Sequence, residues 1–324
     1  MKPKALVLQA RGTNRDLDVM AALTLAGADP VGVPLNNLRS RKTLWRDFQL
    51  LVIPGGFSYA DALGAGKLLA IDLTSYFADE IAAFVNSGKP VIGICNGFQA
   101  LVKSGILPGN HVIARSRGSS ISEQSEECIE TKATKQSQIG GDISVQQETL
   151  APHAHLPWRT VPGSAGVASL TEEQFARNDT IGVTLTFNER GHFECRWVSL
   201  KPASQTCIWT KDLDEIITCP IAHGEGNFQV ADASLLSTFQ TQDQIALTYI
   251  CPNGSSANGD YPANPNGSIL DIAGICNPQG NVLGLMPHPE NHIFDYQHPR
   301  YTRGEKGGRG LGLFENGVKY AEVL

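Results

Sequence analysis

The stretch "VIGICNGFQAL", residues 91–101, decides the fold and points to the chemistry. Residues 91–94 are mostly branched and apolar, as in a strand that is buried on both faces. The predicted strand ends at Cys95, and Asn96-Gly97 leads into a segment with a helical pattern. A nucleophile on such a turn stands clear of the sheet, and the N–H groups that open the helix favour a thiolate. Cys95 is therefore the candidate nucleophile; a core cysteine beside a turn is the alternative that this stretch leaves open.

The two glycines around the cysteine give the pattern G-x-C-x-G. Gly93 and Gly97 carry no side chain, so the backbone is able to turn tightly on both sides of the thiol. The pattern alone is weak, because the chain holds 33 glycines. Its position after an apolar strand makes it informative.

Short apolar runs alternate with helical patterns before this stretch. Strands are expected at 5–9, 31–35, 48–57 and 91–95, with helices at 16–26 and 71–85. Later strands are expected at 191–200, 244–250, 271–277 and 281–290. Strand, helix and strand at this spacing predict an α/β fold, with a mostly parallel sheet flanked by helices. In such sheets the functional loops follow the carboxyl ends of the strands.

Composition narrows the class of protein. The net charge of -6 gives no sign of a nucleic-acid-binding surface. No apolar run approaches the roughly 18 residues of a membrane span, and the apolar start is too short for a secretion signal. We therefore expect a cytoplasmic protein with no membrane or nucleic-acid partner. The seven cysteines are scattered and never spaced as CxxC, which argues against a disulfide framework or a zinc site.

One segment differs from the rest of the chain in amino-acid composition and hydrophobic periodicity. Residues 115–179 are rich in Ser, Gln and Glu and show little periodicity. We interpret them as an irregular insertion of unknown role within a single domain that covers 1–324.

A thiol nucleophile needs a base, and the base needs a group that orients it. The stretch "LMPHPE" places His288 and Glu290 two residues apart between prolines. Proline favours extended backbone in the residue before it, so the imidazole and the carboxylate are predicted to lie on the same side. The segment ends a predicted strand, so it is able to reach the edge of the sheet where Cys95 lies.

At this point the motifs become recognisable. In order, the chain contains "PGGFSYAD", "GICNGFQAL", "IAHGEG", "NPNGS", "DIAGI" and "MPHPE". It resembles class I (triad-type) glutamine amidotransferases, and more narrowly the family of glutaminase subunits of phosphoribosylformylglycinamidine synthase. The resemblance covers about residues 4–113 and 187–324. It implies a flavodoxin-like architecture.

The resemblance implies a role for each matching residue. Cys95 would attack the side-chain amide of L-glutamine and form a glutamyl thioester, His288 would carry protons, and Glu290 would hold His288. Backbone N–H groups of Gly56, Phe57 and Asn96 would bind the oxyanion. Gln99 and His223 would contact the substrate, while a purely structural role for His223 is an equal alternative.

Partners and cofactors are also implied by the resemblance. Ammonia would pass to a synthetase subunit that converts formylglycinamide ribonucleotide to the amidine in de novo purine biosynthesis, and a small accessory subunit would join the complex. ATP and magnesium are expected on the synthetase, with no metal or cofactor in this chain. Two alternatives stay open: a stand-alone flavodoxin-like cysteine hydrolase, and a catalytically silent regulatory subunit.

The chain departs from the family pattern at two places near these motifs. Ala60 stands where the family usually has Gly, and Asn291 stands where it usually has Arg. The "RGTNRD" stretch (11–16) matches a family loop, and its simplest structural role is an Asn/Asp turn that caps the next helix. The basic residues Arg300, Arg303, Lys306 and Arg309 form either a solvated terminal loop or a docking site for the synthetase.

Overall fold

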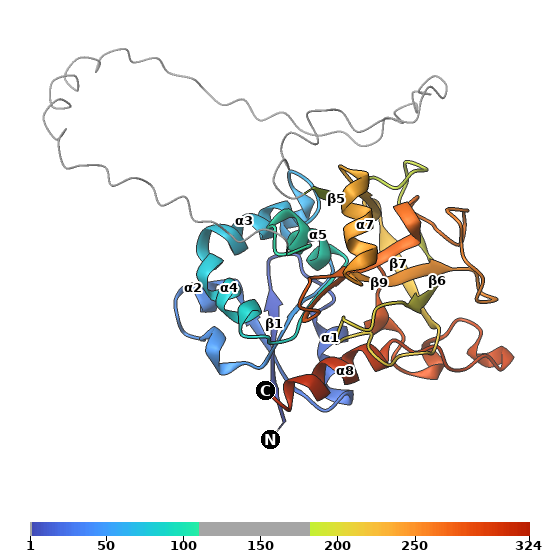
Figure 1. Cartoon of the computed structure of the whole chain (residues 1–324). Coiled ribbons are helices and arrows are strands. Elements are labelled where there is room, and N and C mark those ends of the chain that lie inside the picture. The colour runs from blue at the N-terminus through green and yellow to red at the C-terminus, as the bar shows by residue number, and fades with distance from the viewer. Residues whose placement is uncertain (1, 110–181) are drawn as a thin grey trace, which may run out of the picture. The chain divides into compact units, whose positions relative to one another are not determined.

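The computed structural model describes residues 2–109 and 182–324 (Figure 1). The predicted insertion at 115–179 lies outside the described residues.

The main sheet has nine strands in the order β2-β1-β3-β4-β11-β10-β9-β6-β7, and β5 pairs with β8 in a second, two-stranded sheet. The strands are β1 Lys4–Gln9, β2 Asp29–Pro34, β3 Leu50–Ile53, β4 Val91–Ile94, β5 Val183–Thr186, β6 Glu194–Pro202, β7 Ile217–His223, β8 Asn227–Val230, β9 Ile245–Ile250, β10 Ile272–Cys276 and β11 Val282–Leu285.

The main sheet has a parallel and an antiparallel half. The pairings from β2 through β1, β3 and β4 to β11 are parallel. The pairings from β11 through β10, β9 and β6 to β7 are antiparallel. Only β10 and β6 run against the other seven strands, so the prediction of a mostly parallel α/β sheet is confirmed.

The central strands are buried on both faces, as their apolar runs predict. Every residue of β3, β4 and β11 is buried. The expected strand at 48–57 is too long, because the chain leaves the sheet at Pro54 and Gly56 has a φ of 130°. The expected strand at 281–290 likewise ends at Leu285.

Helices flank the sheet. They are α1 Asp16–Leu25, α2 Leu35–Arg39, α3 Lys67–Tyr76, α4 Ala78–Asn86, α5 Asn96–Lys103, α7 Ala233–Thr241 and α8 Leu311–Ala321. Helices α1 and α8 contact each other, and α3 contacts both α4 and α5. Figure 1 shows these two groups apart from each other, with β1 between them.

The single helix expected at 71–85 is wrong: two helices, α3 and α4, meet at Phe77. Phe77 leaves helical geometry with a φ of -128°, and its side chain is buried with its ring 5.6 Å from that of Trp45. Packing of one aromatic side chain therefore interrupts a pattern that looks continuous in the sequence.

Several elements carry no clear signal in the sequence. Strand β7 contains Pro220, which is tolerated because β7 is an edge strand.

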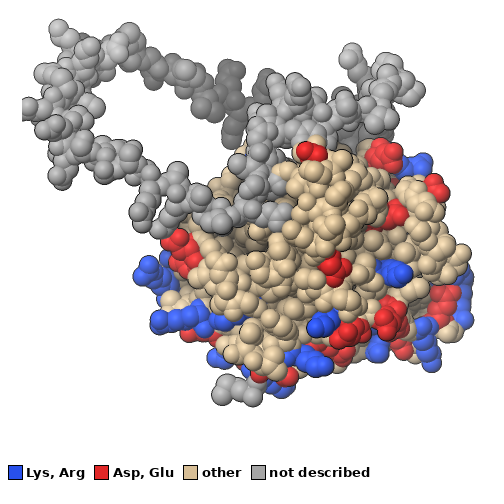
Figure 2. Space-filling view, viewed as in Figure 1, with Lys and Arg blue, Asp and Glu red and all other residues tan. Residues whose placement is uncertain are grey.

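Within the described ranges, no helix is long and apolar enough to cross a membrane. Figure 2 shows acidic and basic side chains interspersed on one face of the molecule.

Candidate active site

The thiol of Cys95 lies on a sharp turn between β4 and α5. Cys95 has a φ of 51° and a ψ of -108°, a left-handed conformation that is strained for a residue with a side chain. Helix α5 begins at the next residue, so its free N–H groups open beside the thiol. This arrangement is a nucleophile elbow, as the stretch at 91–101 predicts.

The two flanking glycines are needed for close approach. A Cβ on Gly97 would lie 2.0 Å from the carbonyl oxygen of Ile53, and one on Gly93 would lie 2.8 Å from that of Gly97. The positive φ of the turn falls on Cys95 itself, and neither glycine adopts one. The glycines thus let strand, turn and helix pack against one another.

His288 and Glu290 form the predicted pair. His288 Nδ1 lies 2.7 Å from Glu290 Oε1, and both side chains are buried. The expected extended backbone is wrong, because Pro289 begins a 3-10 turn, η4 Pro289–Asn291. The backbone N–H of His288 donates to the carbonyl oxygen of Pro220 in β7. This bond connects the histidine–glutamate pair to the antiparallel half of the sheet.

The imidazole of His288 and the thiol converge on one point beside Gly55. A Cβ built on Gly55 would lie 2.8 Å from His288 Cε1 and 3.3 Å from Cys95 Cβ. Glu290 occupies Nδ1 of the ring, which leaves Nε2 for the thiol. Three side chains from β4 and the segment after β11 are therefore brought together.

The charges of this cluster stabilise a thiolate. Burial alone would raise the pKa of the Cys95 thiol, but the charge of His288 and hydrogen bonds from His223 and His288 lower that pKa to about 6. Burial alone would lower the pKa of His288, but the Glu290 carboxylate and Cys95 raise it to about 10. At neutral pH the pair is a thiolate beside an imidazolium.

Of the three predicted oxyanion donors, one is already engaged. The N–H of Phe57 donates to the carbonyl oxygen of Gly12 at 3.1 Å, so it is not a free donor. Within residues 2–109 and 182–324, no backbone hydrogen bond of the Gly56 or Asn96 N–H is found. Both residues line the cavity beside Cys95, so they keep the predicted role.

The loop at 11–16 supports this oxyanion segment. Thr13 pairs with Gly56 in an isolated antiparallel bridge, and the Tyr59 N–H donates to the Arg11 carbonyl oxygen at 2.6 Å. The expected Asn/Asp cap is wrong, because α1 has Arg15 at its N-cap and no side-chain cap bond. The loop holds the turn after β3 in place.

The side chain of Asn96 is held from both ends. Its Nδ2 donates to Asp61 Oδ1 at 2.7 Å, and its oxygen accepts from the hydroxyl of Ser58. Burial raises the pKa of the Asp61 carboxyl, although the hydrogen bond from Asn96 opposes the rise. Asp61 and Ser58 belong to the quoted "PGGFSYAD" motif, yet their contact with Asn96 shows only in the folded chain.

A small cavity opens at the thiol. It has a volume of about 200 Å³, below the roughly 300–1,000 Å³ of sites for drug-sized ligands, so it suits one small metabolite. Its lining is Gly56, Phe57, Asp61, Ala65, Cys95, Asn96, Gln99, Phe187, Phe193, Ala222, His223, Gly224 and Glu225. Phe57, Phe187 and Phe193 line the cavity and are each exposed, so part of its lining is apolar surface open to solvent.

Gln99 lines the cavity but is already hydrogen-bonded. Its Nε2 donates to the carbonyl oxygen of Glu225 at 2.7 Å, across 126 residues of chain. Lys103, one turn further along α5, lies 3.7 Å from the Glu225 carboxylate. Gln99 therefore bridges α5 to the loop after β7, and its contact with substrate stays a prediction.

His223 also lies at the cavity, at the end of β7, and is 4% exposed. Its Nε2 is 3.1 Å from Asn266 Oδ1, and Asn266 Nδ2 donates to the Tyr249 hydroxyl at 2.9 Å. Asn266 and Tyr249 carry no assignment from the sequence. Asn266 falls within the quoted "NPNGS" motif, which is the one signal that could have pointed to it.

The two departures from the family pattern have structural consequences. Ala60 has a φ of 56°, in the left-handed region where glycine is favoured. Asn291 donates to Asp18 Oδ2 at 3.0 Å and so contacts α1.

In the basic terminal loop, Arg300 pairs with Glu305 at 2.8 Å and Arg309 lies 3.7 Å from Asp295.

A cysteine on an elbow, a histidine–glutamate pair and a small cavity are the features that the resemblance to class I glutamine amidotransferases predicts. Two overlapping parts of the chain, residues 2–177 and 166–321, match the family model of the CobB/CobQ-like glutamine amidotransferase domain. The chain belongs to this family.

Individual relatives of the chain carry a more specific name than the family model does. The chain is 44% identical over 323 residues to phosphoribosylformylglycinamidine synthase subunit PurQ of Treponema denticola, covering 99% of each chain. It is 33% identical to the subunit PurQ of Dehalococcoides mccartyi, covering 100% of this chain and 99% of that one. The solved structure of PurLQS from Thermotoga maritima contains a similar chain, with a TM-score of 0.60, 26% identity and 99% coverage of both.

Proposed function

We propose that this chain is the glutaminase subunit of a phosphoribosylformylglycinamidine synthase, acting in purine biosynthesis. Relatives of that name match almost the whole chain. The single observation that carries the proposal is the approach of the His288–Glu290 pair to Cys95, which lines a cavity of about 200 Å³.

The first half of the reaction follows from the charges of the site. The Cys95 thiolate attacks the side-chain amide carbon of L-glutamine, and the carbonyl oxygen becomes an oxyanion. The N–H groups of Gly56 and Asn96 bind this oxyanion. His288, held as imidazolium by Glu290, donates its proton to the departing nitrogen, which leaves as ammonia. A glutamyl thioester on Cys95 remains.

The second half reverses the proton flow. His288, now neutral, removes a proton from water, and the hydroxide attacks the thioester carbon. The same two N–H groups bind the second oxyanion. The carbon–sulfur bond breaks, glutamate leaves, and Cys95 returns to the thiolate with His288 protonated. Glu290 keeps one ring orientation throughout, so the same Nε2 serves both steps.

Ammonia produced here passes to a synthetase subunit, which converts formylglycinamide ribonucleotide to the amidine. We assign ATP and magnesium to that partner, and we include a small accessory subunit in the complex. The solved PurLQS assembly of Thermotoga maritima supports a multi-subunit complex. A cytoplasmic location stays a prediction.

The test uses the reconstituted complex of this chain with its synthetase and accessory subunits. Glutamate release and amidine formation are measured with glutamine or with an ammonium salt as nitrogen source. We expect Cys95→Ser to lower glutamine-dependent synthesis by about 10³-fold or more and to leave ammonium-dependent synthesis unchanged. Cys195→Ser, which alters an exposed cysteine, is the control.

Each alternative predicts a different outcome. Glutamine-dependent synthesis that persists in Cys95→Ser would overturn the proposal. A stand-alone hydrolase would turn over amides without the partner and add nothing to synthesis. A silent regulatory subunit would bind the synthetase while the whole complex releases no glutamate.

A further inference from the structure

Three side chains next to the elbow, those of Ser58, Asn96 and Asp61, form one hydrogen-bonded group, named here the Asn96 clamp. The Ser58 hydroxyl donates to Asn96 Oδ1, and Asn96 Nδ2 donates to Asp61 Oδ1 at 2.7 Å. Ser58 and Asn96 are buried, and Asp61 is partly buried at the cavity. The proton transfers derived for His288 use none of these three side chains.

The clamp admits one orientation of the Asn96 amide. An ionised carboxylate only accepts hydrogen bonds, so the NH₂ group of the amide has to face Asp61. The amide oxygen then faces Ser58, whose hydroxyl donates to it. Gln99 Oε1 lies 3.5 Å from the same amide nitrogen, within reach of its second hydrogen. Both ends of the amide are therefore occupied, which holds the side chain of Asn96 in place.

Both ends of the clamp come from one strained turn. Tyr59, Ala60 and Asp61 have φ values of 55°, 56° and 53°, in the left-handed region that disfavours residues with a side chain. Backbone strain of this kind persists only where surrounding contacts maintain it, and it is concentrated at functional sites. The Tyr59 N–H, which donates to the Arg11 carbonyl oxygen, is one such contact. The strained turn brings both partners of the amide to the same place.

The clamp joins the two proposed oxyanion donors. The N–H of Gly56 lies two residues before Ser58, in the turn after β3. The N–H of Asn96 opens α5 directly after Cys95. The hydrogen bond between Ser58 and Asn96 connects these segments across 38 residues of chain. An oxyanion needs both donors within reach at once, and a misplacement of roughly 1 Å costs about 10²-fold in rate.

We propose that Ser58 and Asp61 are positioning residues, which act through the Asn96 amide and hold the two oxyanion donors at a fixed separation. This inference rests on the proposed function. The clamp serves the carbonyl oxygen of the substrate, whereas His288 serves the thiolate. Loss of the clamp therefore slows attack of Cys95 on a carbonyl carbon. Attack on a saturated carbon stays unchanged, because that reaction places no negative charge on an oxygen.

The test compares two reactions of Cys95 in the reconstituted complex. The first is glutamine turnover, measured as glutamate release. The second is alkylation by iodoacetamide, in which the thiolate forms a bond to the CH₂ carbon and iodide leaves. We expect Asp61→Ala to lower kcat for glutamine by about 10²-fold, with KM and the alkylation rate unchanged.

Asp61→Asn separates the hydrogen bond from the charge. Its side-chain oxygen is able to accept from Asn96 Nδ2, while the negative charge is gone. We expect this variant to recover most of the kcat that Asp61→Ala loses. Recovery of none of it would overturn the inference, because Asp61 would then act by its charge. A raised KM with an unchanged kcat in Asp61→Ala would also overturn it, since Asp61 would then contact the substrate.

Ser58→Ala tests the other end of the clamp and guards against misfolding of the Asp61 variants. We expect kcat to fall by about tenfold, again with an unchanged alkylation rate. Because both ends hold one amide, the double variant with Asp61→Ala should lose less than the product of the two single losses. A loss equal to that product would contradict the inference, because the two residues would then act separately.

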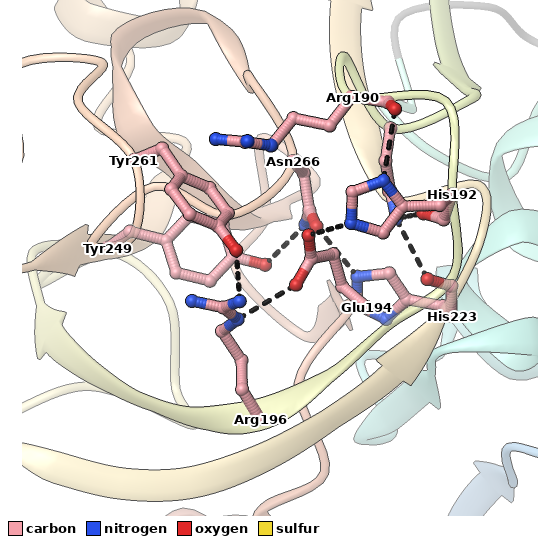
Figure 3. Close-up of polar contacts among 9 residues, drawn as sticks. Arg190, His192, Glu194, Arg196, His223, Tyr249, Tyr261 and Asn266 are labelled. Carbon is pink, nitrogen blue, oxygen red and sulfur yellow. Dashed lines mark hydrogen bonds and ion pairs between the residues drawn. The ribbon is translucent and has the colours of Figure 1, made fainter.

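The matched control is a buried carboxylate outside the clamp. Glu194 in β6 is buried and is held by Arg196 at 2.8 Å and by His192 at 2.9 Å (Figure 3). Glu194→Ala removes these contacts and alters neither oxyanion donor, so we expect kcat to stay unchanged. A loss of kcat equal to that in Asp61→Ala would contradict the inference.

The alkylation rate separates this inference from the proposed function. A parallel fall of alkylation and turnover in Asp61→Ala would overturn the inference, because the clamp would then shape the thiol, and it would leave the proposed function standing. If the wild-type complex released no glutamate from glutamine, the proposed function itself would fail.

Discussion

The two halves of the main sheet contribute to the site in different ways. The parallel half carries the proposed catalytic groups: Cys95 follows β4, and His288 and Glu290 follow β11, its neighbour in the sheet. The antiparallel half and its loops supply the walls of the cavity, among them His223 at the end of β7 and the exposed Phe193 before β6.

The difference is one of chain distance. His288 and Glu290 are two residues apart, and the elbow around Cys95 occupies five consecutive residues. Between the halves, Gln99 of α5 bonds to the carbonyl oxygen of Glu225 across 126 residues, and on the antiparallel side His223 bonds to Asn266 across 43. The proposed reacting groups lie within short local motifs, whereas Gln99 and His223 at the cavity wall bond to residues far away in the chain.

The largest effect is expected in the parallel half, at Glu290. Glu290→Gln removes the charge that raises the pKa of His288, so that pKa falls and the imidazolium no longer stabilises the thiolate. We expect glutamine turnover to drop by about 10²–10⁴-fold. Turnover is measured as glutamate release by the reconstituted complex.

The same variant has a readout that needs no substrate. In the wild type, alkylation of Cys95 by iodoacetamide is lost as the pH falls through about 6, because the thiolate is protonated below its pKa. In Glu290→Gln this inflection moves to higher pH. An inflection that stays in place would show that Glu290 does not act through His288, and Glu305→Gln on the surface is the control.

The next effect tests the close packing of the elbow. Gly97→Ala places a Cβ 2.0 Å from a backbone oxygen, and we expect the free energy of unfolding to fall by about 3 kcal/mol or more. Gly224→Ala in the antiparallel half is the matched control, since its Cβ meets nothing nearer than 3.9 Å. Denaturant titration measures both, and equal losses would remove the contrast between the halves.

A smaller effect is expected where the halves join. Gln99→Leu deletes the hydrogen bond to Glu225, and we expect a loss of about 1–1.5 kcal/mol in unfolding free energy, with a raised KM for glutamine. Thermal unfolding and steady-state kinetics check the two parts. The exposed Gln240, changed to Leu, provides the comparison. A normal KM with lowered stability would mean that the bridge does not shape the cavity.

The smallest effect is a gain. Ala60 has a positive φ, so Ala60→Gly relieves strain and raises the unfolding free energy by about 0.5–1 kcal/mol. Ala83→Gly on the exposed side of α4 lowers it by about 1 kcal/mol. Thermal unfolding of both variants and the wild type measures the two changes in unfolding free energy. A loss at both positions would show that the turn after β3 is not strained.

Much of the site was predictable from short motifs, and the failures have common causes. The pairing of His288 with Glu290 was correct although the backbone between them was not, because two residues in sequence meet in several geometries. Phe57 failed as a free oxyanion donor because Gly12, 45 positions earlier in the numbering, accepts its N–H. The helix expected at 71–85 failed because Phe77 packs on Trp45, which no local pattern encodes.

The sequence by itself determined the parallel sheet, the elbow and the histidine–glutamate pair, because apolar runs, glycine spacing and proline are local constraints on the backbone. Only the tertiary structure decided which polar atoms are free. Within the described ranges the N–H groups of Gly56 and Asn96 have no backbone partner, whereas the N–H of Phe57 and the amide nitrogen of Gln99 already have one. A hydrogen bond depends on where distant segments come to lie, so its presence is decided by packing.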